Sequence, residues 1–319
     1  MSELSNRQKR YLLLQKRHHL IVNLSRLLIL ILFLGLWEIT SRLGMIDSFV
    51  FSSPAKIVRC FWSMVLDRSI FLHLGITLYE TILSFLFVTG ISILIAVILW
   101  YSKKLSEILD PYLVVLNSLP KSALAPLLIV WLGANQTTII IAGMSVAIFG
   151  SILNLYTSFT TIDEEKIKLI YTLHGTRHHA LTKVVLPSSI PAIISNMKVN
   201  IGLCLVGVII GEFLAARNGL GYLIIYSSQV FKMDWLLMSI VLLCIMAMGL
   251  YALINLVEKL CKKTVLKNQG KRILFLQVPL SLILFMTNTS FPFFILLCAL
   301  KHGDISLYKD KQHDQRQNI

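Results

Sequence analysis

Residues 74–100 read LGITLYETILSFLFVTGISILIAVILW and contain a single charged side chain, Glu80. An α-helix needs about 20 mostly apolar residues to cross the hydrocarbon core of a bilayer. A run of this length with so little charge therefore predicts a helix that spans a membrane.

Further apolar runs lie on both sides of this segment, at residues 20–39, 111–132, 138–159, 191–214 and 235–257. Each is long enough to cross a bilayer. Leu119-Pro120-Lys121 and Pro126 are expected to interrupt the run at 111–132. The chain is thus predicted to be an all-α, polytopic membrane protein with a six-helix core over residues 20–262.

The composition agrees with a lipid environment. Of the 319 residues, 56% are hydrophobic and 14% are charged, and the mean hydropathy is +0.75, whereas soluble domains are about 25% charged. The net charge of +14 has two readings, a nucleic-acid-binding face or the basic cytoplasmic loops of a membrane protein. The hydropathy favours the second, so the bilayer is the expected partner and no nucleic acid is.

The basic residues also predict an orientation. Lys and Arg gather in the polar N-terminus 1–19 and in segments 101–110, 161–190 and 258–272. Because such loops face the cytoplasm, we expect an inner (cytoplasmic) membrane protein whose N-terminus is cytoplasmic. A cleaved signal peptide is not expected, since Trp37-Glu38 stands where small residues would form the cleavage site.

The C-terminal part does not fit a six-span pattern. Residues 273–300 form another apolar run, interrupted by Pro279, Asn288 and Pro292, and residues 301–319 form a polar tail of mixed charge. The run is long enough to span, and a seventh span is the favoured interpretation. A re-entrant or interfacial hairpin is the alternative.

The longest polar break between spans is residues 161–190, TIDEEKIKLIYTLHGTRHHALTKVVLPSSI. A helix is expected over 163–171, because acidic residues favour a helix N-terminus, and a second over 178–185. Gly175 separates the two, and Leu186-Pro187 is expected to end the second. Such an element is suited to docking into a groove on another protein, although an ordinary solvated loop is an equal alternative.

No catalytic constellation or cofactor site is apparent. His174, His178 and His179 have helical spacing, but no Cys or carboxylate completes a zinc site, so no metal is expected. A phosphate-binding GxxxxGK[ST] loop is absent. If ATP drives this protein, a separate subunit must therefore hydrolyse it, and the chain is not expected to be an enzyme.

Polar residues inside spans are candidates for a translocation path, because they are costly in lipid. They are Asn117 and Lys121, which flank the helix break at Pro120, together with Asn200 and Glu212; Pro120 is included in the candidate path. An interhelical hydrogen bond is the favoured alternative for Asn200. Gly207 and Gly211 form a GxxxG pattern that permits close helix approach, within this chain or between two subunits.

Several motifs together resemble the inner-membrane permease subunits of binding-protein-dependent ABC importers, over residues 30–262. They are Leu36-Trp37-Glu38 with Phe51-Ser52-Ser53-Pro54, Leu119-Pro120-Lys121 with Trp131-Leu132-Gly133, Gly211-Glu212, and Gly219-Leu220-Gly221-Tyr222. In the loop 161–190, the family's Gly and Leu-Pro are matched by Gly175 and Val184-Val185-Leu186-Pro187 with Pro191. The chain is most similar to the branch for nitrate, sulfonate, taurine and thiamine precursors.

Two departures from the family pattern concern this loop. The family's Glu-Ala-Ala triplet is absent, since Lys168-Leu169-Ile170-Tyr171 stands before Gly175. The Gly is also one residue closer to Leu-Pro than the pattern has it, so either His174 or Gly175 occupies the family's Gly position.

The resemblance implies a permease that forms a translocation path for a small solute, such as a small anion or an organic sulfonate. It implies three protein partners: ABC ATPase subunits, a second permease copy in a homodimer, and an extracytoplasmic solute-binding protein. The implied ATPase-coupling residues are Asp163, Leu173, His174, Gly175, Thr176, Arg177, Val185, Leu186, Pro187 and Pro191.

A secondary transporter or channel without an ATPase is the alternative function. It would be expected to show an internal repeat and ionisable residues at the span centres. The sequence shows no clear repeat, and the span centres are almost free of charge.

Overall fold

The computed structural model describes residues 6–45, 47 and 49–267, and all regular secondary structure in those ranges is helical. Within them, five helices are long and apolar enough to cross a membrane: Leu20–Arg42, Ser69–Tyr101, Gln136–Thr160, Arg177–Ala215 and Met233–Leu260. A bent pair, Lys103–Ser118 with Lys121–Leu132, makes a sixth if it is one span. The predicted all-α membrane fold is confirmed. The predicted segments 273–300 and 301–319 lie outside the described residues.

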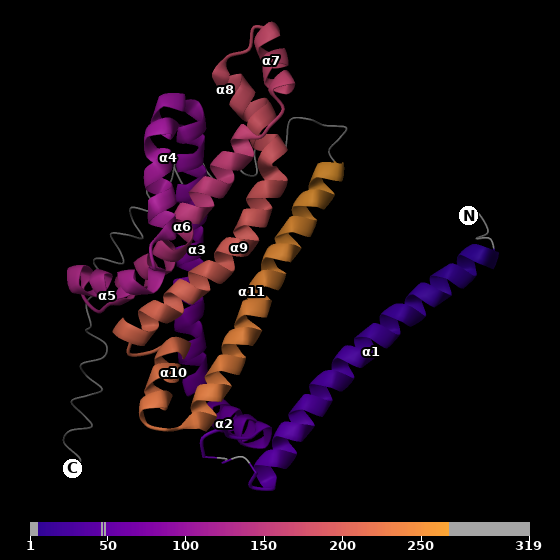
Figure 1. The fold of residues 1–319 in the computed structure, drawn as a ribbon, viewed down its shortest axis with the longest axis vertical. Helices are drawn as coiled ribbons and strands as arrows, with labels where there is room; N and C mark the ends of the chain where they lie inside the picture. The colour runs from indigo at the N-terminus through magenta and orange to yellow at the C-terminus, as the bar shows by residue number, and fades with distance from the viewer. Residues whose placement is uncertain (1–5, 46, 48, 268–319) are drawn as a thin grey trace. The chain divides into compact units, whose positions relative to one another are not determined.

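The chain forms two compact units. Among the described residues, the first contains those up to His73 together with Leu223–Leu242, and the second contains Leu74–Tyr222 and those from Leu243 onward. Figure 1 labels the helices, whose bounds are α1 Asn6–Arg42, α2 Pro54–Leu66, α3 Ser69–Tyr101, α4 Lys103–Ser118, α5 Lys121–Leu132, α6 Gln136–Thr160, α7 Glu164–Thr172, α8 Arg177–Ala180, α9 Leu186–Ala215, α10 Leu220–Gln229 and α11 Met233–Lys267. A π-helical turn, η1 (Leu181–Val185), joins α8 to α9.

In the first unit, hydrogen bonds of Ser52 and Ser53 hold the connection between α1 and α2. Ser52 is fully buried with a left-handed backbone (φ 55°). Its hydroxyl donates to Asp234 Oδ1 at 2.5 Å, and its carbonyl accepts from the Ser41 hydroxyl at 3.2 Å. Ser53 caps α2 by accepting from Lys56 N. These bonds satisfy backbone and side-chain polar groups that would otherwise be buried without partners.

The predicted interruption at Leu119-Pro120-Lys121 is confirmed, because α4 and α5 meet there at 95°. Leu119 has an extended backbone (φ −61°, ψ 141°), as expected for a residue before proline. The predicted interruption at Pro126 is wrong. Pro126 lies inside α5, since a membrane helix tolerates one missing N–H where neighbouring groups compensate.

The segment 215–234, which lies between the apolar runs 191–214 and 235–257, contains the ten-residue helix α10. A run of apolar residues, LGYLIIY, follows Gly219 and forms its first two turns. Sequence analysis did not predict this helix, because tertiary contacts satisfy its first N–H groups. Thr77, 143 residues away, accepts from Leu220 N, and Glu212 at the end of α9 accepts from Gly221 N.

In the second unit, α6 and α9 pack along each other (Figure 1). Small residues allow this approach: a Cβ atom added to Gly207 would lie 2.8 Å from Gly143 Cα and 2.9 Å from Ala142 O. A Cβ atom on Gly211 would lie 3.1 Å from Ile139 Cα. The GxxxG pattern at Gly207 and Gly211 therefore serves close packing within this chain.

Gly207→Ala is expected to force α6 and α9 apart, because the added methyl group meets backbone atoms that have no room to move. Overpacking of this kind costs about 1–3 kcal/mol, so the melting temperature of the purified protein in detergent should fall. Gly202→Ala on the same helix is the matched control, because nothing lies within 4 Å of its added Cβ. Equal melting temperatures for the two variants would contradict this packing.

Candidate functional site

The segment 161–190 forms a helical projection beyond the ends of α6 and α9 (Figure 1). Its first helix, α7, begins where the acidic residues predicted it. Asp163 Oδ1 accepts from Glu165 N at 3.0 Å, and Glu164 and Glu165 occupy the first turn. Carboxylates at these positions interact favourably with the positive end of the helix dipole.

Two consecutive residues with different roles end α7. His174 has a left-handed backbone (φ 57°), and its N–H bonds Tyr171 O at 3.0 Å, while Gly175 N bonds Ile170 O at 2.8 Å. This is the hydrogen-bond pattern of a Schellman motif. A Cβ atom on residue 175 would lie 2.7 Å from Ile170 O. The positive φ is therefore at His174, and the close backbone approach is at Gly175.

The second helix of the segment does not end at Leu186-Pro187, so that prediction is wrong. After Thr176, the chain passes through α8 and the π-helical turn η1 and enters α9 directly. Pro187 lies at the start of α9, where its missing N–H and fixed φ are tolerated. The wider π turn before it changes the hydrogen-bond register, and Pro191 lies inside the same helix.

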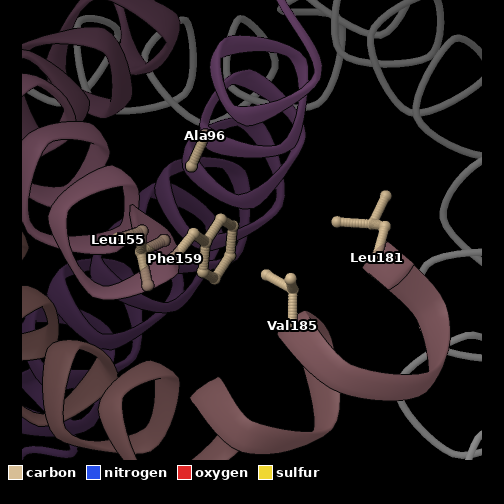
Figure 2. Close-up of a cluster of buried hydrophobic side chains, with 5 residues drawn as sticks. All are labelled: Ala96, Leu155, Phe159, Leu181 and Val185. Carbon is tan, nitrogen blue, oxygen red and sulfur yellow. The ribbon is translucent and has the colours of Figure 1, made fainter. Parts of the chain in front are cut away.

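A buried apolar cluster joins this segment to two long helices. Val185 and Phe159 are fully buried, as is Ala96, and Leu155 and Leu181 are nearly so. Figure 2 shows Phe159, from the end of α6, lying beside Val185 of η1, with Ala96 of α3 next to them. Because protein interiors are close-packed, a displacement of η1 has to be shared with the ends of α3 and α6.

Arg177 makes a second connection to α3. Its Nη2 donates to Trp100 O at 3.0 Å, which satisfies a carbonyl in the last turn of that helix. Its guanidinium also lies 5.4 Å from the Trp100 ring centroid and 5.5 Å from that of Tyr101, within cation–π range. The first residue of α8 is thus attached to the end of α3.

The projection exposes apolar side chains that touch little else. Leu173 is 71% exposed, Leu169 58% and Tyr171 46%. Thr176 N donates to His179 Nδ1 at 3.2 Å, so this histidine supports the turn. These exposed residues form the tip of the projection, and the buried cluster around Val185 and Phe159 forms its base. Exposed apolar residues on a well-packed support are typical of a surface that contacts another protein.

The residues predicted to line a translocation path lie in two different environments. Asn117, Pro120 and Lys121 lie at the break between α4 and α5, where the Lys121 ammonium contacts Asn117 O. Asn200 is buried and donates to Ser151 Oγ at 2.9 Å, as does Asn196 at 2.7 Å. Glu212 is also buried, with Thr77 as a hydrogen-bond donor. Their role in a path stays a prediction.

Sequence analysis missed the base of the projection, which includes Leu155 and Phe159 of α6. Both residues lie in a run where every face is apolar, so nothing singles out the side that meets η1. Their spacing of four, matched by Leu181 and Val185, is the one signal available, since residues four apart share a helix face.

His174→Gly is expected to stabilise the protein by about 1 kcal/mol, because glycine adopts a positive φ without strain. Gly175→Ala should instead destabilise it, since the new methyl group meets Ile170 O. Limited proteolysis of the segment should therefore slow in the first variant and accelerate in the second. The opposite order would show that the helix end is assigned wrongly.

Comparison with known proteins agrees with this architecture. The family described as "binding-protein-dependent transport system inner membrane component" matches residues 88–266, which is more than half of the chain. A chain in the structure of the MetNI methionine ABC transporter in inward-facing conformations has the same fold, with a TM-score of 0.53 and 18% identity. The match covers 62% of this chain and 96% of that one.

Curated relatives are permease proteins. The putative aliphatic sulfonates transport permease of Bacillus subtilis is 25% identical over 71% of this chain and 82% of its own length. The taurine transport system permease of Escherichia coli is 23% identical (69% and 83%), and the nitrate import permease of Synechococcus elongatus is 24% identical (60% and 72%). The chain therefore belongs to the family of inner membrane components of binding-protein-dependent transport systems, as the multi-pass permease subunit of an ABC importer in which ATP hydrolysis falls to a separate subunit.

Proposed function

We propose that residues 161–190 dock an ABC ATPase subunit and pass its movement to the membrane helices. The strongest support is how the segment is attached. Leu169 and Leu173 are exposed at its far end, whereas η1 at its other end packs against the ends of α3 and α6. A partner that binds the tip moves the base, because the contact at Val185 and Phe159 leaves no free space to absorb the displacement.

The proposed contact uses the whole set of coupling residues, each with a structural task. Asp163 starts α7, while His174 and Gly175 end it. Thr176 and Arg177 begin α8, and Arg177 attaches it to α3. Leu173 supplies the exposed contact. The remaining four residues carry the connection into α9: Val185, Leu186, Pro187 and Pro191.

Such a segment would face the cytoplasm, with the N-terminus on the same side. The support is the distribution of Lys and Arg, which are abundant in 1–19, 101–110, 161–190 and 258–272. Two of the three segments on the other side, 133–137 and 215–234, contain only Arg217 and Lys232, while residues 40–73 contain Arg42, Lys56, Arg59 and Arg68. Basic loops of membrane proteins remain in the cytoplasm.

The complete importer is proposed to contain two copies of this chain, two ATPase subunits and an extracytoplasmic binding protein that delivers the solute. ATP binding would draw the ATPases together, and the docked segments would convert this into alternating access of the path between the copies. Two packings of the helices, biased by ATP and by the loaded binding protein, are sufficient for such a cycle.

The transported solute is proposed to be a small anion, such as an aliphatic sulfonate. Support comes from relatives named for aliphatic sulfonates, taurine and nitrate. In this chain, Lys121 is a cation at the break between α4 and α5, beside Asn117. A break in a membrane-spanning helix frees backbone groups and is found where a helix lines a cavity.

Docking is tested with Leu173→Asp, which places a charge at the exposed tip without disturbing a buried contact. The variant should reach the membrane normally but lose co-purification with the ATPase, because desolvating an unpaired carboxylate opposes binding. Met45→Asp is the matched control: Met45 is 76% exposed and lies beyond the end of the spanning helix α1, and the control should retain the ATPase. Unchanged ATPase binding by the Leu173 variant would contradict the docking assignment.

The solute proposal is tested by reconstituting the importer with its binding protein and measuring ATP-dependent uptake of an aliphatic sulfonate. Lys121→Gln should reduce that uptake about tenfold or more, because losing a charge-assisted hydrogen bond costs about 1.5–3 kcal/mol. Lys104→Gln, at an exposed lysine in the first turn of α4, should leave uptake unchanged. Transport restricted to neutral or cationic solutes would refute the proposed solute class.

A further inference from the structure

Two acidic side chains are completely buried in the second unit. Glu80 of α3 and Glu212 of α9 each have 0% of their surface exposed, and both belong to helices long enough to span the membrane. None of the ion pairs found among the described residues involves either of them. A buried carboxylate without a cation is costly and requires other partners.

Glu212 has such partners, and they are hydrogen-bond donors. Its Oε1 accepts from the Thr77 hydroxyl at 2.6 Å, and its Oε2 accepts from Gly221 N at 2.6 Å. The backbone N–H of Tyr222 donates to the same carboxyl group. These N–H groups belong to the first turn of α10, where the helix dipole favours a negative charge.

The two glycines before and within this turn allow the carboxyl group to approach. A Cβ atom on Gly219 would lie 2.6 Å from Glu212 Oε2, and one on Gly221 would lie 2.7 Å from the same atom. Gly219 also has a positive φ of 120°. The Gly-Leu-Gly sequence at 219–221 thus forms a pocket fitted to the Glu212 carboxylate.

Glu80 is different, because neither of its carboxyl oxygens receives a hydrogen bond from an N–H or O–H group in the described part of the chain. It lies three residues after Thr77, on the same face of α3. Its carboxyl group is in hydrogen-bonding contact with that of Glu212. Two carboxyl groups this close, both shielded from water, do not ionise together, since like charges repel strongly there.

We propose that Glu80 is a proton-carrying acid that donates its O–H to the Glu212 carboxylate, so that the pair binds one proton and holds the first turn of α10 against α3 and α9. The negative charge is assigned to Glu212 and the proton to Glu80, because the hydrogen-bond donors point at Glu212 and none points at Glu80. This proposal is independent of ATPase docking.

The proposal is tested by two variants, in each of which an amide NH₂ group replaces one oxygen of a carboxyl group. Glu80→Gln should leave the melting temperature within about 2 °C of that of the unmodified protein, because its amide donates as the acid O–H does. Glu212→Gln should lower it by about 5 °C or more, because both oxygens of Glu212 are acceptors and the new NH₂ group faces a donor. Equal losses, or a marked gain for Glu80→Gln, would overturn the proposal.

Infrared spectroscopy of the unmodified protein in lipid at neutral pH provides a readout that stability alone does not. A protonated carboxyl group has a C=O stretching band distinct from that of a carboxylate. We expect this band in the unmodified protein and its loss in Glu80→Gln, where Glu212 is the remaining acid and is charged. Absence of the band, or its persistence in Glu80→Gln, would overturn the proposal.

Discussion

The contact between Phe159 and Val185 determines what the polar segment of this permease is able to do. Phe159 ends a spanning helix, and Val185 lies in the turn that leads from the projection into α9 (Figure 2). Both side chains are fully buried. A loop without such a base would move freely in solvent, and force applied at its tip would not reach the membrane helices.

Arg177 strengthens this base from a different direction. The apolar cluster resists compression, whereas the Arg177–Trp100 hydrogen bond and the cation–π contacts resist separation of α8 from α3. The segment is therefore attached to α3 by two kinds of interaction and runs without interruption into α9. A displacement of this segment would therefore be shared by α3 and α9.

Lipid imposes a second constraint, because polar groups in the helix core must find partners inside the protein. Asn196 and Asn200 share Ser151, Thr77 serves both Leu220 N and Glu212, and Lys198 pairs with Glu258 at 2.5 Å. Each of these bonds joins residues distant in the chain. These bonds specify which helix faces pack together, whereas uniform apolar surfaces could pack in several ways.

The sequence alone determined the membrane class, the positions of the spans, the break at Pro120 and the start of α7 at Asp163, because apolar length, proline and helix capping act over short stretches of chain. Only the tertiary structure decided that α10 forms, that helix continues through Pro187, and which of His174 and Gly175 has the positive φ. It also decided that Phe159 meets Val185 and that Glu80 meets Glu212. Those outcomes depend on which faces of helices distant in sequence come into contact. A spanning helix that is apolar on every face has no local sequence pattern that identifies the face in contact.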